Sequence, residues 1–323
     1  MSATPRSAQG GLAQQQQASS KQMNVRKITL ALLSGLAGAQ NACGTAGVNC
    51  GEAEAQQTGI AQQWSGFGTP VRLGTWSRPQ RCPPETDFGR LEDLLPQKHF
   101  RGPLSGPASY FKRVPPHYLG HHANFSKCER SVYIDVGARE FDSKEGMLST
   151  FAVYPQLLGF DEFYAFEAAS GFYKLPPQPD LVRRLQRQGM SAARAASFAR
   201  RHFFLQAFIG ARSNPSTTPP TLGFSDLLKT MLGLQPADAV VVKMDVEGYE
   251  YDIVRTLLAD GTHALIDEIL LEVHYGHPAM MRRFNWCRMP KPGWQFWCSY
   301  SLQNATAMYR ALRDAGVYAH HWP

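Results

Sequence analysis

The sequence lacks several features that would place it quickly in a known class. The first 51 residues contain no acid, and Arg6, Lys21, Arg26 and Lys27 give them +4 of the net charge of +7. The rest of the chain therefore carries only +3 (7 − 4), so composition gives no argument for a nucleic-acid partner. The six cysteines form no C-x-x-C pair and no Cys/His spacing typical of zinc. The 43% of apolar residues is nevertheless enough for a packed core.

A long apolar run is also missing near the N-terminus. Residues 28–39 are apolar, but a membrane-spanning helix needs about 20 such residues. Basic residues precede this run, and its last three residues, Ala37-Gly38-Ala39, would suit signal peptidase, as in a secretory signal. Sequons at Asn124 and Asn304 favour the same route, to the Golgi or lumen. The acid-free N-terminus also fits a plastid or mitochondrial transit peptide, and the apolar run could act as a membrane anchor.

Composition divides the chain into three parts. Residues 1–75 are low in complexity and predict a targeting or disordered segment. Residues 76–127 are rich in proline and predict a linker or an irregular wrap. Residues 128–323 alternate strand-like and helix-like patterns and predict the folded domain. Cys82 with Cys128, and Cys287 with Cys298, could form disulfides in an oxidising lumen, and free thiols are the alternative.

The folded part has the pattern of a doubly wound, largely parallel α/β sheet. The expected strands are residues 131–136, 163–166, 202–209, 239–244, 265–275 and 317–322. Helices are expected at residues 143–158, 181–201, 224–232 and 304–315, and from residue 250 to just before Gly261. Residues 239–244 are apolar apart from Lys243, which is typical of a central parallel strand. In open α/β sheets ligands bind beyond the carboxyl ends of the strands, so those ends are where a site is expected.

Acids and a glycine stand at the ends of the first two strands. The first strand ends in Asp135-Val136-Gly137 without the GxGxxG of dinucleotide enzymes, which argues against a nicotinamide-dependent oxidoreductase. A glycine there lets the backbone approach a ligand closely. Glu167 ends the second strand, where an acid can bind both hydroxyls of a ribose. Asp135 alone could equally cap a turn, but the pair indicates a nucleoside-type cofactor.

A second group of polar residues follows the fourth and fifth strands. Asp245 with Glu247, and Glu272 with His274, are each two residues apart and would point to one face of a strand. Asp245 or His274 could act as a base, and His274 has the more suitable ordinary pKa. The four could also hold a divalent metal, which we do not expect. In the structural alternative, Glu247 and Glu272 bind backbone amides or Lys243, and His274 is a satisfied strand-end histidine.

Residues 276–301 form a long insertion that contains aromatic and basic residues and no acid. The aromatic side chains could stack on a sugar, and the cations would suit an acidic sugar or a phosphate. The alternative, which we favour, is a local core closed by Cys287 and Cys298.

The segments YIDVGAR, FYAFEA, LQAFIGA and VVKMDVEGYEYDIV resemble, in order, the motifs of FkbM-type methyltransferases. LIDEILLEVHY and VYAHHW are similar to a land-plant and algal branch of that group whose substrates are not established. The resemblance covers about residues 128–323. Its Lys-x-Asp-x-Glu-Gly-x-Glu core is fairly specific, whereas Asp-Val-Gly alone is a weak signal. The chain departs from the family pattern where the usual hairpin after the last helix is reduced to a single strand.

The resemblance implies a Rossmann-like class I methyltransferase fold that binds S-adenosylmethionine (SAM). The residues that it would assign to the methionine and ribose parts of the cofactor are Asp135, Gly137 and Glu167. Phe208 and Gly210 would flank the adenine, and Asp245 would lie beside the methyl group. The expected activity is O-methylation of a hydroxyl on a small molecule or glycan. The alternative is a catalytically inactive methyltransferase-like module that binds a glycan or a protein partner.

Overall fold

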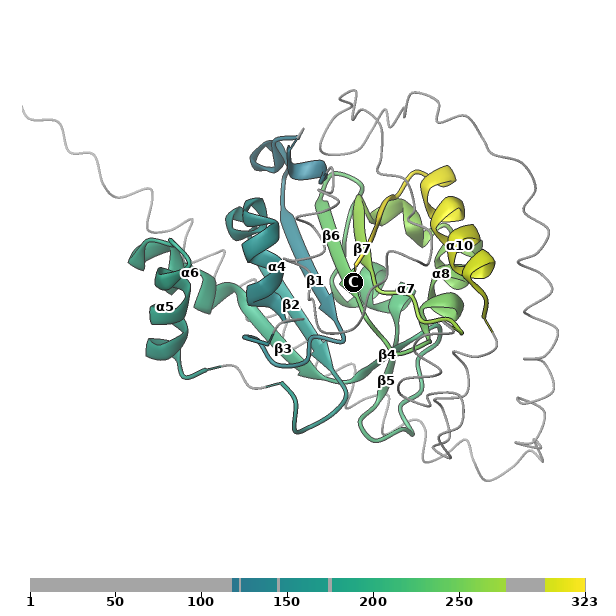
Figure 1. Ribbon diagram of the computed structural model, residues 1–323, viewed down its shortest axis with the longest axis horizontal. Helices are drawn as coiled ribbons and strands as arrows, with labels where there is room; N and C mark the ends of the chain where they lie inside the picture. The colour runs from purple at the N-terminus through teal and green to yellow at the C-terminus, as the bar shows by residue number, and fades with distance from the viewer. Residues whose placement is uncertain (1–117, 122, 144–145, 174–175, 277–299, 323) are drawn as a thin grey trace, which may run out of the picture.

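The computed structural model describes residues 118–121, 123–143, 146–173, 176–276 and 300–322 (Figure 1). Its main feature is a six-stranded sheet with the order β3-β2-β1-β6-β7-β8, in which every neighbouring pair is parallel. The strands are β1 (Ser131–Val136), β2 (Glu162–Glu167), β3 (His202–Gln206), β6 (Ala239–Met244), β7 (Glu268–Leu271) and β8 (Tyr318–His321). The predicted α/β class with a parallel sheet is confirmed.

Helices cover both faces of this sheet (Figure 1). One face carries α4 (Met147–Val153), α5 (Gln178–Arg187) and α6 (Ala192–Arg201). The other face carries α7 (Phe224–Asp226) with the π-helix Leu227–Met231, α8 (Glu250–Ala259) and α10 (Leu302–Asp314). The central strands serve both cores, because successive side chains point to opposite faces: in β1, Val132 packs on one side and Tyr133 on the other.

Two predicted elements are each split in the structure. The helix expected at 181–201 is two helices, because Gly189 adopts a left-handed φ of 89° and Ser191 caps the start of α6. The strand expected at 202–209 ends at Gln206. After Ala207 the chain forms β4 (Phe208–Gly210), which pairs with β5 (Thr221–Gly223) in a separate small sheet.

Two other predicted elements are shorter than expected. The helix predicted at 143–158 begins only at Met147, with Gly146 as its N-cap, and a separate 3-10 turn (Pro155–Gly159) follows it. Pro155 favours this break, because a proline disfavours helical backbone at the residue before it, here Tyr154. The strand predicted at 265–275 keeps only the four residues of β7, after a 3-10 turn at Thr262–Leu265. Gly261, with a φ of 77°, ends α8 as predicted.

The packed core also includes residues that precede Cys128. Tyr118 is buried and stacks on Tyr154, with ring centroids 4.2 Å apart. The backbone N–H of Leu119 donates to Glu268 Oε1 over 2.8 Å. Glu268 also accepts a 2.6 Å bond from the Tyr154 hydroxyl and lies 2.9 Å from His320 Nε2. This buried network, which we call the Glu268 network, ties residues 118–119 to β7 and β8.

Several predictions fall outside the described residues. These are the signal-like run at 28–39, almost all of the Pro-rich stretch, and the aromatic insertion up to residue 299. Cys128 is disulfide-bonded, and the other five cysteines lie outside the described part of the chain. Asn304 is buried in the capping box of α10, so its sequon is not accessible, whereas Asn124 is exposed. No helix within the described ranges is long and apolar enough to cross a membrane.

Candidate functional site

The strand order places a change of direction between β1 and β6. The chain runs outward from β1 through β2 to β3, and then continues on the other side of β1 with β6, β7 and β8. A crevice for ligands forms beyond the carboxyl ends of two such strands. Here the two backbones come very close: a Cβ on Gly137 would lie 1.7 Å from the carbonyl oxygen of Asp245. Gly137 also has a φ of 75°, so both sterics and conformation require glycine at this point.

Asp135 is completely buried, and its partner is on the neighbouring strand β6. Lys243, directly opposite in the register, places its Nζ 3.2 Å from Asp135 Oδ1 and donates to the Gly137 carbonyl over 3.1 Å. Burial raises the pKa of Asp135 to about 6, against the opposing effect of Lys243. Burial alone would lower the pKa of Lys243, but Asp135 and Asp245 hold it above its ordinary value. Asp135 is thus held inside the protein by its partner on β6.

Glu167 lies at the end of β2, as predicted, and its carboxylate already binds two backbone amides. Oε2 accepts from the N–H of Arg139 over 3.0 Å, and Oε1 accepts from the N–H of Ala169 over 2.8 Å. The first bond joins the loop after β1 to the loop after β2. Each carboxylate oxygen has a further acceptor position, so Glu167 keeps the capacity to bind hydroxyl groups.

Phe208 and Gly210 lie in β4, which follows β3, the neighbour of β2 in the sheet. The N–H of Ala207 donates to the carbonyl of Glu167 over 3.2 Å, and β4 begins with the next residue. The Phe208 side chain is 43% exposed. The residues that the resemblance assigns to ribose and adenine therefore lie at the end of β2 and just after the end of its neighbour β3.

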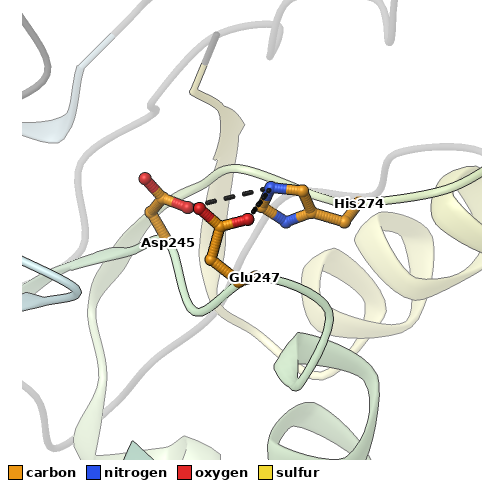
Figure 2. Close-up of side chains that lie close together, drawn as sticks. All are labelled: Asp245, Glu247 and His274. Atoms are coloured by element: carbon orange, nitrogen blue, oxygen red, sulfur yellow. Dashed lines mark ion pairs between the residues drawn. The ribbon is translucent and has the colours of Figure 1, made fainter. Parts of the chain in front are cut away.

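The second predicted group comes together around one histidine, and Figure 2 shows three of its members, Asp245, Glu247 and His274. His274 is buried, and its Nε2 lies 3.4 Å from Glu247 Oε2, 3.7 Å from Glu272 Oε1 and 3.9 Å from Asp245 Oδ1. Its Nδ1 lies 2.9 Å from Oε1 of Glu250, a fully buried acid in the first turn of α8. We call these five residues the His274 cluster. Asp245, Glu247 and His274 each offer one ligand atom, and the three atoms lie within 4.8 Å of one another.

The surrounding acids decide the charge of the ring. Burial alone would lower the pKa of His274, but the carboxylates, Glu250 foremost, outweigh it and hold the pKa well above its ordinary value. Burial and the neighbouring Asp245 raise the pKa of Glu272 well above its usual range. The cluster therefore combines one imidazole ring, whose pKa is raised, with an excess of carboxyl groups.

The geometry of the cluster differs from the alternation that the sequence suggested. Both predicted pairs lie beyond the strands, which end at Met244 and Leu271. Glu247 reaches His274 because its backbone adopts a left-handed φ of 56°, which is uncommon for a residue other than glycine. Lys243, expected to bind Glu247 or Glu272 in the structural alternative, forms its ion pair with Asp135 instead.

Glu250 belongs to the site, although the sequence pattern did not indicate it. The helix dipole alone explains an acid in the first turn of α8. In the structure, Glu250 Oε1 accepts the N–H of Val246 over 3.1 Å as well as facing His274. The sequence gives no further signal for Glu250, because its contact with His274 depends on how the chain segments pack in space.

No protein-family model matches the chain, and no curated protein matches it.

Proposed function

We propose that this chain is a SAM-dependent O-methyltransferase of the FkbM type, which acts in the secretory pathway on a hydroxyl of a glycan or small molecule. The observation that carries the proposal is the set of groups at the carboxyl ends of adjacent parallel strands. Gly137 and Glu167 lie at the ends of β1 and β2, and the His274 cluster lies beyond β6 and β7. This is where an open α/β sheet binds a nucleoside-type cofactor.

The charge of this edge favours SAM over a dinucleotide. Six carboxyl groups at this edge (Asp135, Glu167 and the four acids of the His274 cluster) outnumber the basic side chains of Arg139, Lys243 and His274. SAM carries a positive sulfonium and a positive amino group, both of which an acidic edge attracts. A dinucleotide would place a doubly negative diphosphate there, which the same acids would repel.

The proposed reaction is an in-line displacement. The acceptor oxygen forms a bond to the methyl carbon, the bond between that carbon and the sulfonium sulfur breaks with its electron pair going to sulfur, and the hydroxyl proton goes to a base. Positioning supplies most of the rate. We assign the base to Asp245, whose Oδ1 is buried and accepts no hydrogen bond from the described residues. The carboxylates around His274 raise its pKa well above the ordinary value, so we assign no proton transfer to the ring.

One observation favours a second candidate, the inactive binding module. Glu167 already accepts two backbone amides and Asp135 is paired with Lys243, so two residues assigned to the cofactor also have structural partners. A chain that had kept the fold and lost the chemistry would retain these interactions for stability. Cofactor binding separates the two candidates.

The test is calorimetric titration of the full chain with SAM and with S-adenosylhomocysteine, with EDTA present throughout. Glu167→Gln removes the charge of the acceptor that a ribose would use. A hydrogen bond to a charged group contributes about 1.5–3 kcal/mol, so we expect its affinity for SAM to fall by roughly 10- to 100-fold. The matched control is Glu162→Gln, a buried acid at the opposite end of β2 that pairs with Arg130 over 2.8 Å. This variant should bind SAM as the wild type does.

If the wild type binds SAM and the two variants differ as expected, screening of sugar acceptors for methyl transfer follows. If the folded wild type binds neither ligand, as judged alongside its circular dichroism spectrum, the methyltransferase proposal is wrong and the binding module is favoured. Equal loss of affinity in both variants would also contradict the assigned role of Glu167.

A further inference from the structure

We propose that the His274 cluster is a binding site for one divalent metal ion of the Mn²⁺ type, held by Asp245, Glu247 and His274. This inference does not depend on SAM binding, and the sequence pattern alone did not lead us to expect such an ion. It is based on the spacing of the three ligand atoms, on the way the imidazole is held, and on one buried oxygen without a hydrogen bond.

The spacing of the ligand atoms suits a common ion. Around a metal with bonds of about 2.1 Å, neighbouring ligand atoms lie about 3 Å apart and opposite ones about 4 Å apart. His274 Nε2 is 3.4 Å from Glu247 Oε2 and 3.9 Å from Asp245 Oδ1. All three ligand atoms lie within 4.8 Å of one another, so small side-chain movements would bring them to one ion (Figure 2).

The imidazole is held as a metal ligand usually is. A metal-binding histidine points one ring nitrogen at the ion and donates from the other to a carboxylate or carbonyl, which fixes the tautomer and the ring orientation. His274 Nδ1 faces Glu250 Oε1 at 2.9 Å, and Glu250 is itself fixed by the backbone N–H of Val246. Nε2 is therefore directed at Asp245 and Glu247. Glu250 acts here as a positioning residue.

A buried oxygen points into the site without a hydrogen bond. Asp245 is only 7% exposed, and its Oδ1 has no hydrogen-bond partner among the described residues. A buried polar atom without such a partner is costly, and in native proteins it often faces a bound ion or an ordered water. A second feature is the left-handed φ of 56° at Glu247, because strained backbone of this kind is concentrated at functional sites.

The donor set indicates the class of ion. Two carboxylate oxygens and one imidazole nitrogen suit Mn²⁺ and similar divalent transition ions better than Ca²⁺, which prefers oxygen alone. Three protein ligands leave coordination positions open, and the exposed side of the site is formed by Glu247, whose side chain is 56% exposed. If the proposed function also holds, an acceptor hydroxyl bound at an open position would lose its proton more readily, and with the ion bound Asp245 would serve as a ligand rather than as the base.

The test is a titration of the full chain with Mn²⁺ alone, without SAM, in which the electron paramagnetic resonance signal of free Mn²⁺ measures binding. We expect one saturable site per chain. Asp245→Asn and His274→Gln should abolish it, and Glu250→Gln should weaken it by about 10- to 100-fold. The matched control is Asp252→Asn, which removes a surface acid of the same helix that pairs with Arg255 over 3.2 Å. This variant should bind Mn²⁺ like the wild type.

Two results would overturn the metal site. One is the absence of saturable binding by the folded wild type, and the other is binding that persists unchanged in both Asp245→Asn and His274→Gln. Circular dichroism of each variant shows whether a loss of binding is a loss of folding, and Glu250→Gln retains the shape of its side chain. Because the SAM titration contains EDTA and this one contains no SAM, each proposal can fail without the other.

Discussion

Replacing Gly137 with alanine tests whether the close approach of β1 and β6 organises the site. The new Cβ would lie 1.7 Å from the Asp245 carbonyl oxygen, and such contacts are essentially never shorter than 3.0 Å. The two loops must therefore separate by at least 1.3 Å (3.0 − 1.7). That movement stretches the 2.9 Å bond from the Asp245 N–H to the Val136 carbonyl. It also displaces the backbone that carries the Asp245 side chain.

The expected cost has two parts. The left-handed backbone, with its φ of 75°, costs about 1–2 kcal/mol for alanine. Overpacking adds about 1–3 kcal/mol. Gly261→Ala is the matched control, because Gly261 has a φ of 77° and a Cβ added there would meet nothing within 4 Å. Gly261→Ala should lose only the unfolding free energy that the left-handed backbone costs. The difference in unfolding free energy between the two variants therefore measures the cost of the close contact at Gly137.

The assay is urea unfolding of both variants, followed by the Mn²⁺ and SAM titrations. We expect Gly137→Ala to lose about 2–5 kcal/mol of unfolding free energy and to weaken both ligands, and Gly261→Ala to lose about 1–2 kcal/mol with ligand binding unchanged. A displacement of about 1 Å can reduce a site's performance by about 100-fold. Equal destabilisation by the two variants, or wild-type ligand binding by Gly137→Ala, would refute the reasoning.

Three further predictions concern the buried charges. Lys243→Met leaves Asp135 buried without its partner and should cost about 3–5 kcal/mol in urea unfolding, most of which adding Asp135→Asn should restore; no recovery in the double variant would contradict the pairing. Burial lowers the pKa of His202 to about 4, so between pH 6.5 and 4 the unfolded chain binds a proton that the folded chain does not. The free energy of unfolding should therefore decrease by about 3 kcal/mol as the pH is lowered from 6.5 to 4. Asp135 changes stability in the opposite direction, so the readout is the difference between wild type and His202→Gln, which should shrink as the pH falls; a difference independent of pH would contradict the prediction. Glu268→Gln keeps the shape of the Glu268 network but removes its charge, and thermal unfolding should show a loss of about 1–3 kcal/mol, whereas an unchanged melting temperature would mean that the network contributes nothing.

Local pattern predicted some elements of the fold to the residue. The run at 239–244 forms β6 with the predicted bounds, because a short apolar, β-branched segment has few alternatives to a buried parallel strand. The prediction of one helix at 181–201 was wrong, because its arginine-rich pattern concealed the left-handed turn at Gly189. The strand expected at 202–209 shows a second limit. Both halves are extended, but they pair with different partners, and pairing is not a local property.

The amino-acid sequence by itself determined the α/β class, and it placed Asp135, Glu167, Asp245 and His274 at or just beyond strand ends. The fold class and these positions both follow from patterns within a few consecutive residues. Only the tertiary structure decided which of these groups meet. Lys243 binds Asp135 because β1 and β6 are neighbours in one particular register, although they are distant in the chain. Glu250 faces His274 because α8 packs beside the end of β7. Contacts of this kind depend on strand order, register and the turn of a single backbone residue such as Glu247, which no local pattern specifies.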